Sequence, residues 1–273
     1  MLSLNTNMMA LVARRSWAQT ESALAVTTAR LSSGLRINSA RDDAAGLAIS
    51  ERLLAQIRGT DVAARNANDA VSMAQIGESA AGSVVDALQR MNELAVQASN
   101  GTLTSSDRAL LELEFDQLQA EVADLVADTA YDGTKLLNNA NSADIQVGPN
   151  AGQTVTVTRT DLSGMSSTVG ALSVAGATGA SASAAITALE SALTTATSAQ
   201  ASWGAVQNRF DSVVSQLQSS SLILNAARGR IVDADIATET SNRARLLVLQ
   251  DSAVAMLAQA NARPQMVLSL LLG

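Results

Sequence analysis

The residue types that perform most enzyme chemistry are scarce or absent in this sequence of 273 residues. Cysteine and histidine do not occur, which removes disulfides, thiol nucleophiles, most zinc sites, the HExxH motif and the commonest general base. The most concentrated ionisable groups are eight carboxylates between residues 101 and 135, set against Arg108 and Lys135. A charge run of this kind is usually a solvated helix face. We therefore expect no enzyme activity, no cofactor and no metal site.

Composition also restricts the partners that the chain can bind. The net charge of −7 and the aromatic content of 2% disfavour nucleic acid. The longest strongly apolar run covers residues 266–272, far short of the roughly 20 residues that span a bilayer, so we expect no membrane insertion. Hydrophobic residues make up 47% of the chain and are largely Ala, Leu and Val, which is typical of helix seams rather than of a thick globular core.

Three seams of apolar residues, with spacings that alternate between three and four, predict the elements of the fold. The first seam contains Ala67, Ala70, Ala74, Gly77, Ala81, Val84, Leu88, Met91, Ala95 and Ala98. The second contains Leu111, Phe115, Leu118, Val122 and Leu125, and the third contains Val206, Phe210, Val213, Leu217, Ser220, Leu224, Ala227 and Ile231. Because the seams come from distant parts of the sequence, they predict a bundle of long helices.

The middle of the chain has a different pattern. Residues 145–147 and 154–158 alternate branched and polar side chains around a turn that contains Pro149, which predicts a β-hairpin. Residues 162–183 are rich in Gly, Ser, Ala and Thr, and we interpret them as an exposed loop or a short irregular cap. The only prolines, Pro149 and Pro264, both lie where a long helix could be interrupted.

Residues 31–49, LSSGLRINSARDDAAGLAI, are the most specific string in the chain. Gly34 suits the left-handed position after a helix, and Asn38 suits the turn that follows. Asp42 and Asp43 supply a cap and negative charge at the start of the next helix. The string closely resembles the joint between the core and the outer tube of bacterial flagellin, in which Gly34, Arg36, Asn38, Asp42 and Asp43 are the matching residues.

The two ends of the chain agree with this resemblance. Residues 207–264 resemble the flagellin C-terminal region almost throughout, and the likeness is strongest at 207–210, 230–237, 241–242, 257–261, Pro264 and the 267–272 tail. Residues 5–7 match the opening of the family. The likeness covers roughly residues 1–148 and 185–273, and the short middle leaves no room for the surface domains that longer members insert.

The resemblance implies a mainly α fold: a long-helix coiled-coil bundle with a small β-hairpin region and paired N- and C-terminal helices. It implies an inner-core helix in residues 1–43 that pairs with residues 233–273. It places residues 44–180 and 181–232 in the outer tube, with no separate surface domain. The apolar residues expected to form the polymerisation core are Leu4, Leu11, Leu24, Leu31, Leu246, Leu249, Leu257, Val267, Leu270 and Leu271.

The implied function is that of a structural subunit, which polymerises with copies of itself into the helical filament used for swimming. The family's other partners are the flagellar cap, hook-junction proteins and an export chaperone. Its subunits leave the cell through the flagellum's own type III channel, so we expect an extracellular location. Two alternatives remain: a hook-filament junction protein of the same family, or a helical signalling rod of the chemoreceptor type.

One binding site is also implied by the resemblance. Residues 88–97, LQRMNELAVQ, are similar to the flagellin segment that Toll-like receptor 5 recognises. Gln89, Arg90 and Leu94 fit that pattern, and Glu114 is the matching residue on the next helix. Leu94 also lies beside the first apolar seam, which favours a structural role for it.

Overall fold

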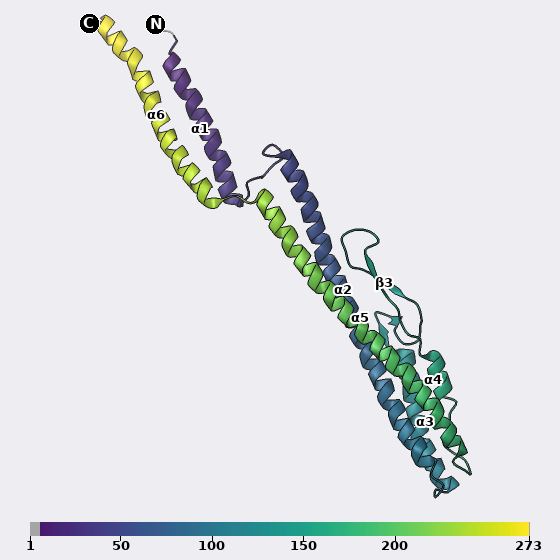
Figure 1. The fold of residues 1–273 in the computed structure, drawn as a ribbon. Coiled ribbons are helices and arrows are strands. Elements are labelled where there is room, and N and C mark those ends of the chain that lie inside the picture. The colour runs from purple at the N-terminus through teal and green to yellow at the C-terminus, as the bar shows by residue number, and fades with distance from the viewer. Residues whose placement is uncertain (1–5, 273) are drawn as a thin grey trace. The chain divides into compact units, whose positions relative to one another are not determined.

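The chain is mainly helical, as the sequence predicts. The structure is a computed structural model that describes residues 6–272, and the side chains of residues 6–263. Its helices are α1 (Met8–Ser33), α2 (Ala44–Ala98), α3 (Ser105–Asp128), α4 (Ser163–Val169), α5 (Ala180–Val232) and α6 (Ile236–Leu272) (Figure 1). Its strands are β1 (Ala130–Tyr131), β2 (Thr134–Lys135), β3 (Ala143–Gln146) and β4 (Thr154–Val157).

The chain divides into two compact units. The terminal unit contains residues 1–55 and 223–273, and the central unit contains residues 56–222, so the boundaries fall within α2 and α5. The predicted division at residues 43, 180 and 232 remains a prediction. In the terminal unit α1 and α6 lie side by side, which confirms that the N- and C-terminal helices pair (Figure 1).

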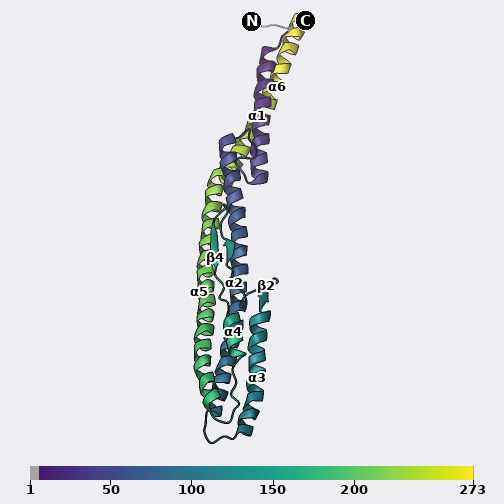
Figure 2. The same ribbon diagram turned by 90° about the vertical axis from the view of Figure 1, so that its right-hand side faces the viewer.

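The core of the central unit lies along the predicted seams, where α2, α3 and α5 meet (Figure 2). All ten residues of the first seam are buried in α2. Phe115 and Val122 of the second seam are fully buried, and so is Phe210 of the third. Most of the α2 seam is Ala or Gly, so the neighbouring helix can approach closely. At Gly77 the ring of Trp203 occupies the space where a β-carbon would stand.

The predicted β-hairpin is confirmed. β3 and β4 pair antiparallel, with Ala143 opposite Val157 and Gln146 opposite Thr154. Val155 and Val157 face the core, whereas Thr154 and Thr156, which alternate with them, are exposed, as the alternation of residue types requires. A second, shorter hairpin joins β1 to β2.

The interpretation of residues 162–183 as an exposed loop or a short irregular cap is only partly right, because much of the segment is exposed but some of its apolar side chains are buried. This segment contains α4, and Leu162, Val169 and Val174 are each 1% exposed or less. Side chains of α3 satisfy its irregular backbone. The Gln119 amide donates to two carbonyl oxygens of the segment at 2.8 Å, and a Glu112 carboxylate oxygen accepts two of its backbone N–H groups at 2.6 and 2.9 Å. The segment therefore packs as part of the bundle.

The two prolines differ in their effect on the helices. Pro149 lies in the turn between β3 and β4, outside any helix. Helix α6 runs through position 264 to Leu272, so the expectation that Pro264 interrupts a helix is wrong.

Candidate assembly surface

The joint after α1 is held by backbone hydrogen bonds between residues 34–36 and residues 232–234, both in the terminal unit. The Arg36 amide donates to the carbonyl oxygen of Val232 at 2.6 Å, and the Ala234 amide donates to that of Gly34 at 2.9 Å. The Arg36 guanidinium adds a bond to the carbonyl oxygen of Ile231 at 2.5 Å. Gly34 has a φ of 72°, which favours glycine, and its amide caps α1. The predicted joint residues Gly34 and Arg36 thus meet the end of α5.

The two aspartates of the joint have different roles. The Asp43 carboxylate accepts the Gly46 amide at 2.8 Å and so caps α2, as predicted. Asp42 does not cap this helix, because its carboxylate closes the preceding turn. It accepts the Ser39 hydroxyl at 3.0 Å and the amides of Ser39 and Asn38 at 2.9 and 3.1 Å. The Ser39 hydroxyl is the main group that lowers the pKa of Asp42, followed by the two amides.

Polar contacts near both ends align α1 with α6. Arg30 of α1 forms an ion pair of 3.1 Å with Glu239 of α6, whose carboxylate is largely buried. Near the other end of the pair, the side-chain amide of Asn7 donates to the carbonyl oxygen of Ala260 at 2.8 Å. The ion pair joins residues 209 positions apart in the sequence, so no local pattern could have indicated it.

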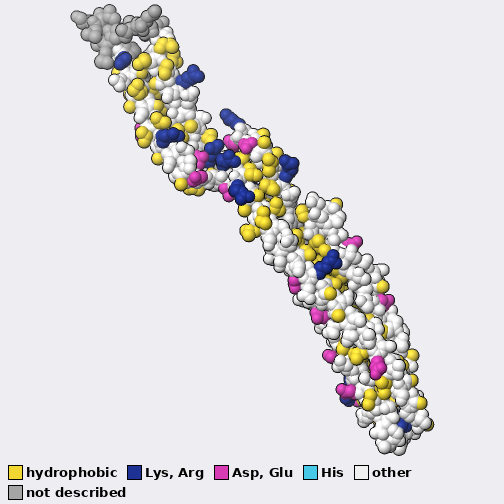
Figure 3. Space-filling view, viewed as in Figure 1, with side chains coloured by type: hydrophobic (Ala, Val, Ile, Leu, Met, Phe, Trp, Pro, Cys, Tyr) yellow, Lys and Arg dark blue, Asp and Glu magenta, His cyan; other side chains and the backbone are white. Residues whose placement is uncertain are grey.

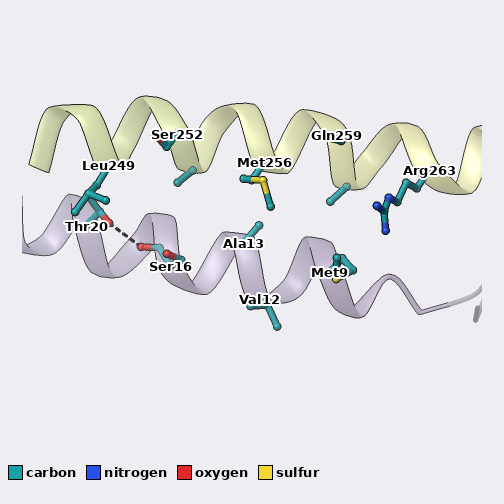
Figure 4. A pocket seen from close by; sticks show the side chains of 12 residues that line it. Met9, Val12, Ala13, Ser16, Thr20, Leu249, Ser252, Met256, Gln259 and Arg263 are labelled. Carbon is teal, nitrogen blue, oxygen red and sulfur yellow. Dashed lines mark hydrogen bonds between the residues drawn. The ribbon is translucent and has the colours of Figure 1, made fainter. Parts of the chain in front are cut away.

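A predominantly apolar groove runs between α1 and α6 (Figure 4). Met256 points from α6 toward Ala13 of α1, and Arg263 reaches toward Met9 (Figure 4). The residues that line the groove are Met9, Val12, Ala13, Ser16, Thr20, Leu249, Ser252, Ala253, Met256, Gln259, Ala260 and Arg263. A second, shallower groove on the same pair contains Arg14, Trp17, Ala18, Val254 and Leu257.

The expected polymerisation residues whose side chains the structure describes fall into two groups. Leu11 and Leu249 are about half exposed, at 52% and 49%. Leu24, Leu31, Leu246 and Leu257 are partly buried. Leu4 lies outside the described residues, as do the side chains of Val267, Leu270 and Leu271.

The helix pair exposes further large apolar side chains besides the expected polymerisation residues. They are Met8, Met9, Val12, Val26, Ile236, Leu247, Val248, Val254 and Met256. On the face in view, hydrophobic side chains gather over this pair (Figure 3). A surface of this kind on a folded protein marks an interaction site.

The residues matched to a receptor site lie in the central unit. Gln89 is exposed on α2, and Arg90 binds Glu114 of α3 through two nitrogen atoms at 2.9 and 2.8 Å. Arg90 also binds Glu93 at 2.8 Å. The expectation that Leu94 contacts a receptor is wrong for its side chain, which is 1% exposed and belongs to the bundle core.

Two buried arginines were missed by the sequence analysis. Arg108, counted there only as a countercharge, is 2% exposed and donates to the carbonyl oxygens of Ala98 at 2.8 Å, Asn100 at 3.0 Å and Ala177 at 3.3 Å. It thereby ties the end of α2 to the segment before α5. Arg159 donates in the same way to the carbonyl oxygens of Asn141 and Lys135. Every residue has a backbone carbonyl group, so no sequence pattern could have indicated these partners.

Two features are absent from the part of the chain that the structure describes. No helix there combines the length and hydropathy needed to cross a bilayer. Within the same residues, no cluster of three or more acidic side chains is arranged to hold a metal ion.

Comparison with known proteins gives concordant results. A profile of the bacterial flagellin N-terminal helical region matches residues 4–142, and one of the C-terminal helical region matches residues 186–271. The chain is 43% identical over 245 residues to a flagellin of Halalkalibacterium halodurans, covering 89% of each protein. It is 35% identical to flagellin FlaB2 of Treponema pallidum, covering 98% of this chain and 99% of that one. The crystal structure of Bacillus cereus flagellin superposes with a TM-score of 0.51 at 31% identity, covering 56% of this chain and 88% of that one.

Proposed function

Because this chain belongs to the bacterial flagellin family and is a structural subunit of the flagellar filament, we propose that the α1–α6 pair supplies the contacts by which copies polymerise. The observation that carries this proposal is the apolar surface of the pair, with large side chains exposed on both helices. A helix pair that exposes many large apolar side chains gains free energy by burying them against another protein.

The pair offers more than one docking face, which suits a polymer. The groove that contains Met256 and the groove that contains Trp17 are lined by different residues of the same two helices. A contact between two different faces is heterologous, and a heterologous contact that does not close generates a helical assembly. We expect each copy to bind its neighbours through different faces of its pair.

Membership of the family also suggests where and with what the subunit works. The filament is extracellular, and we infer that the chain reaches it through the flagellum's type III channel, accompanied by an export chaperone. Cap and hook-junction proteins are the proposed partners at the two ends of the filament. We assign the chain no catalytic role.

Toll-like receptor 5 remains a proposed partner, and the central unit would be the part of the subunit that it binds. Gln89, Arg90 and Glu114 are exposed, which supports a surface contact. Leu94 is removed from the proposed contact because its side chain is buried. The bonds from Arg90 to Glu114 and Glu93 would hold this surface rigid, a property that favours recognition by a preformed site.

The assembly proposal is tested by placing a charge in the groove. Val12 lines the groove and is 65% exposed, so Val12→Asp should leave the isolated subunit folded. In the polymer the same carboxylate would have to be desolvated in a mainly apolar contact, at an effective cost of several kcal/mol. We expect the critical concentration for seeded assembly, measured by sedimentation and electron microscopy, to rise about a hundredfold or more.

Ser22→Asp is the matched control, because Ser22 is an exposed residue of α1 that does not line this groove. Circular dichroism should show the same helix content for both variants. The proposal fails if Val12→Asp assembles at the wild-type critical concentration. It also fails if Ser22→Asp impairs assembly to the same extent.

A further inference from the structure

The sulfur atoms of this protein are unevenly placed. The chain contains eight methionines and no cysteine, so thioethers are its only sulfur groups. Among the described side chains, the widely exposed methionines are Met8 at 62%, Met9 at 54% and Met256 at 57%, and all three belong to the α1–α6 pair. In the central unit, Met73 and Met91 are 6% and 0% exposed, and Met165 is partly buried. An oxidant in solution would therefore reach the helix pair first.

Two of the exposed methionines belong to one surface. Met9 of α1 and Met256 of α6 both line the groove, and the Met256 side chain points across it toward α1 (Figure 4). Met8 is the neighbour of Met9 in sequence and is at least as exposed, but it does not line the groove. The groove thus places two accessible thioethers on the surface proposed to bind the next copy.

We propose that Met9 and Met256 are oxidation sites, and that their conversion to sulfoxides by a peroxide blocks assembly of the subunit. This inference rests on the proposed role of the groove. In the reaction a sulfur lone pair attacks one peroxide oxygen and the O–O bond breaks. The thioether is oxidised by two electrons to the sulfoxide, and the peroxide is reduced to water.

The physical effect follows from the polarity of the product. A thioether favours burial in an apolar contact, whereas a sulfoxide carries a strong hydrogen-bond acceptor. The groove is mainly apolar, so the sulfoxide oxygen would lose bonds to water on assembly and gain few in return. We expect the critical concentration for assembly to rise about tenfold for each sulfoxide.

The same geometry predicts when the subunit is sensitive. In the free subunit both thioethers are exposed to solvent. In the polymer they would be covered by a neighbouring copy. Oxidation would therefore exclude free subunits from the filament, while subunits that have already been incorporated are protected.

The experiment treats purified full-length protein with hydrogen peroxide, maps sulfoxides by peptide mass spectrometry and measures seeded assembly. The variants are M9L/M256L, which keeps the groove apolar, and M8L as the matched control. Wild type and M8L should lose assembly by tenfold or more after oxidation, whereas M9L/M256L should keep it. Treatment with methionine sulfoxide reductases A and B should restore assembly of the oxidised wild type.

Two results would overturn the inference. One is equal loss of assembly by M9L/M256L, which would assign the effect to another methionine, including Met1 or Met266. The other is normal assembly of wild type in which mass spectrometry shows both groove sulfoxides. The Val12→Asp variant separates these failures from failure of the proposed function, because it tests the groove without an oxidant.

Discussion

Gly77 is the position where the close approach of α2 and α5 is most sensitive to a single methyl group. A β-carbon at this position would lie 2.6 and 2.7 Å from two ring atoms of Trp203, and 3.0 Å from a third. Ordinary contact begins at 3.4 Å, so the ring would have to move by roughly 0.8 Å. Trp203 is 2% exposed and belongs to the buried core of the central unit, so it has little room to move. Gly77→Ala should therefore destabilise the central unit.

The size of the effect comes from two opposing contributions. Overpacking a well-packed core costs about 1–3 kcal/mol. Replacing Gly by Ala inside a helix returns about 1 kcal/mol through backbone entropy. Gly204→Ala in α5 is the matched control, because its β-carbon would meet its nearest neighbour only at 3.9 Å. The propensity gain is common to both variants, so Gly77→Ala should be less stable than Gly204→Ala by about 1–3 kcal/mol.

The assay is urea unfolding of both variants in a Trp17→Phe background, in which Trp203 is the only tryptophan and reports on the central unit. Circular dichroism at the same urea concentrations checks that helix loss and fluorescence change coincide. If Gly77→Ala is as stable as Gly204→Ala or more stable, the close contact between α2 and the ring does not limit the packing, and this reasoning is refuted.

Two further predictions concern charged groups. Arg108→Met should destabilise the central unit by about 3 kcal/mol, because three carbonyl oxygens, that of Ala98 in a buried bond, lose their donor; urea unfolding with Arg90→Met as an exposed control measures this. The folded state lowers the pKa of Asp42, so the ionised carboxylate stabilises the fold. This stabilisation is complete above the pKa that Asp42 has in the unfolded chain, and it is lost as the pH falls through the pKa that Asp42 has in the folded chain. At pH 7 Asp42→Asn should therefore melt below wild type, and the difference should shrink below about pH 4; a difference in melting temperature that stays constant down to pH 2 would contradict this.

Local patterns were sufficient where burial repeats along one helix. The alternating spacing from Ala67 to Ala98 identified ten buried residues of α2. Residues at this spacing lie along one side of a helix, and that side must be covered by a neighbouring helix. The hairpin of β3 and β4 was predictable for the same reason, since residue types alternate with the two faces of a strand.

Local patterns failed where a distant side chain decides the structure. The Gly- and Ser-rich residues 162–183 suggested an exposed loop or a short cap. Glu112 and Gln119, more than forty residues earlier, satisfy part of the backbone of this segment, and Val169 and Val174 are buried there. The joint shows the same limit, since either Asp42 or Asp43 could have capped α2. Only the position of Ser39 assigns Asp42 to the turn.

The assembly surface was predictable in type but only partly in its residues. The apolar character of α6 indicated that the helix needs partners, yet the sequence could not separate Leu246, which is partly buried, from Leu249, which is half exposed. That distinction depends on how α6 is rotated against α1. The contacts from Asn7 and Arg30 that set this alignment join opposite ends of the chain.

Because the assembly surface needs both α1 and α6, only a subunit that contains both ends of the chain can form it. The bond from Asn7 to Ala260 joins residues 253 positions apart, whereas the central unit is one continuous stretch of chain. Because synthesis proceeds from the N-terminus, the chain can form the central unit before α6, the helix that pairs with α1, has been made. A product that stops before α6 would contain α1 without the other wall of the groove. Broken or prematurely ended copies would then lack the surface for joining the polymer, and no separate sorting step would be needed to exclude them.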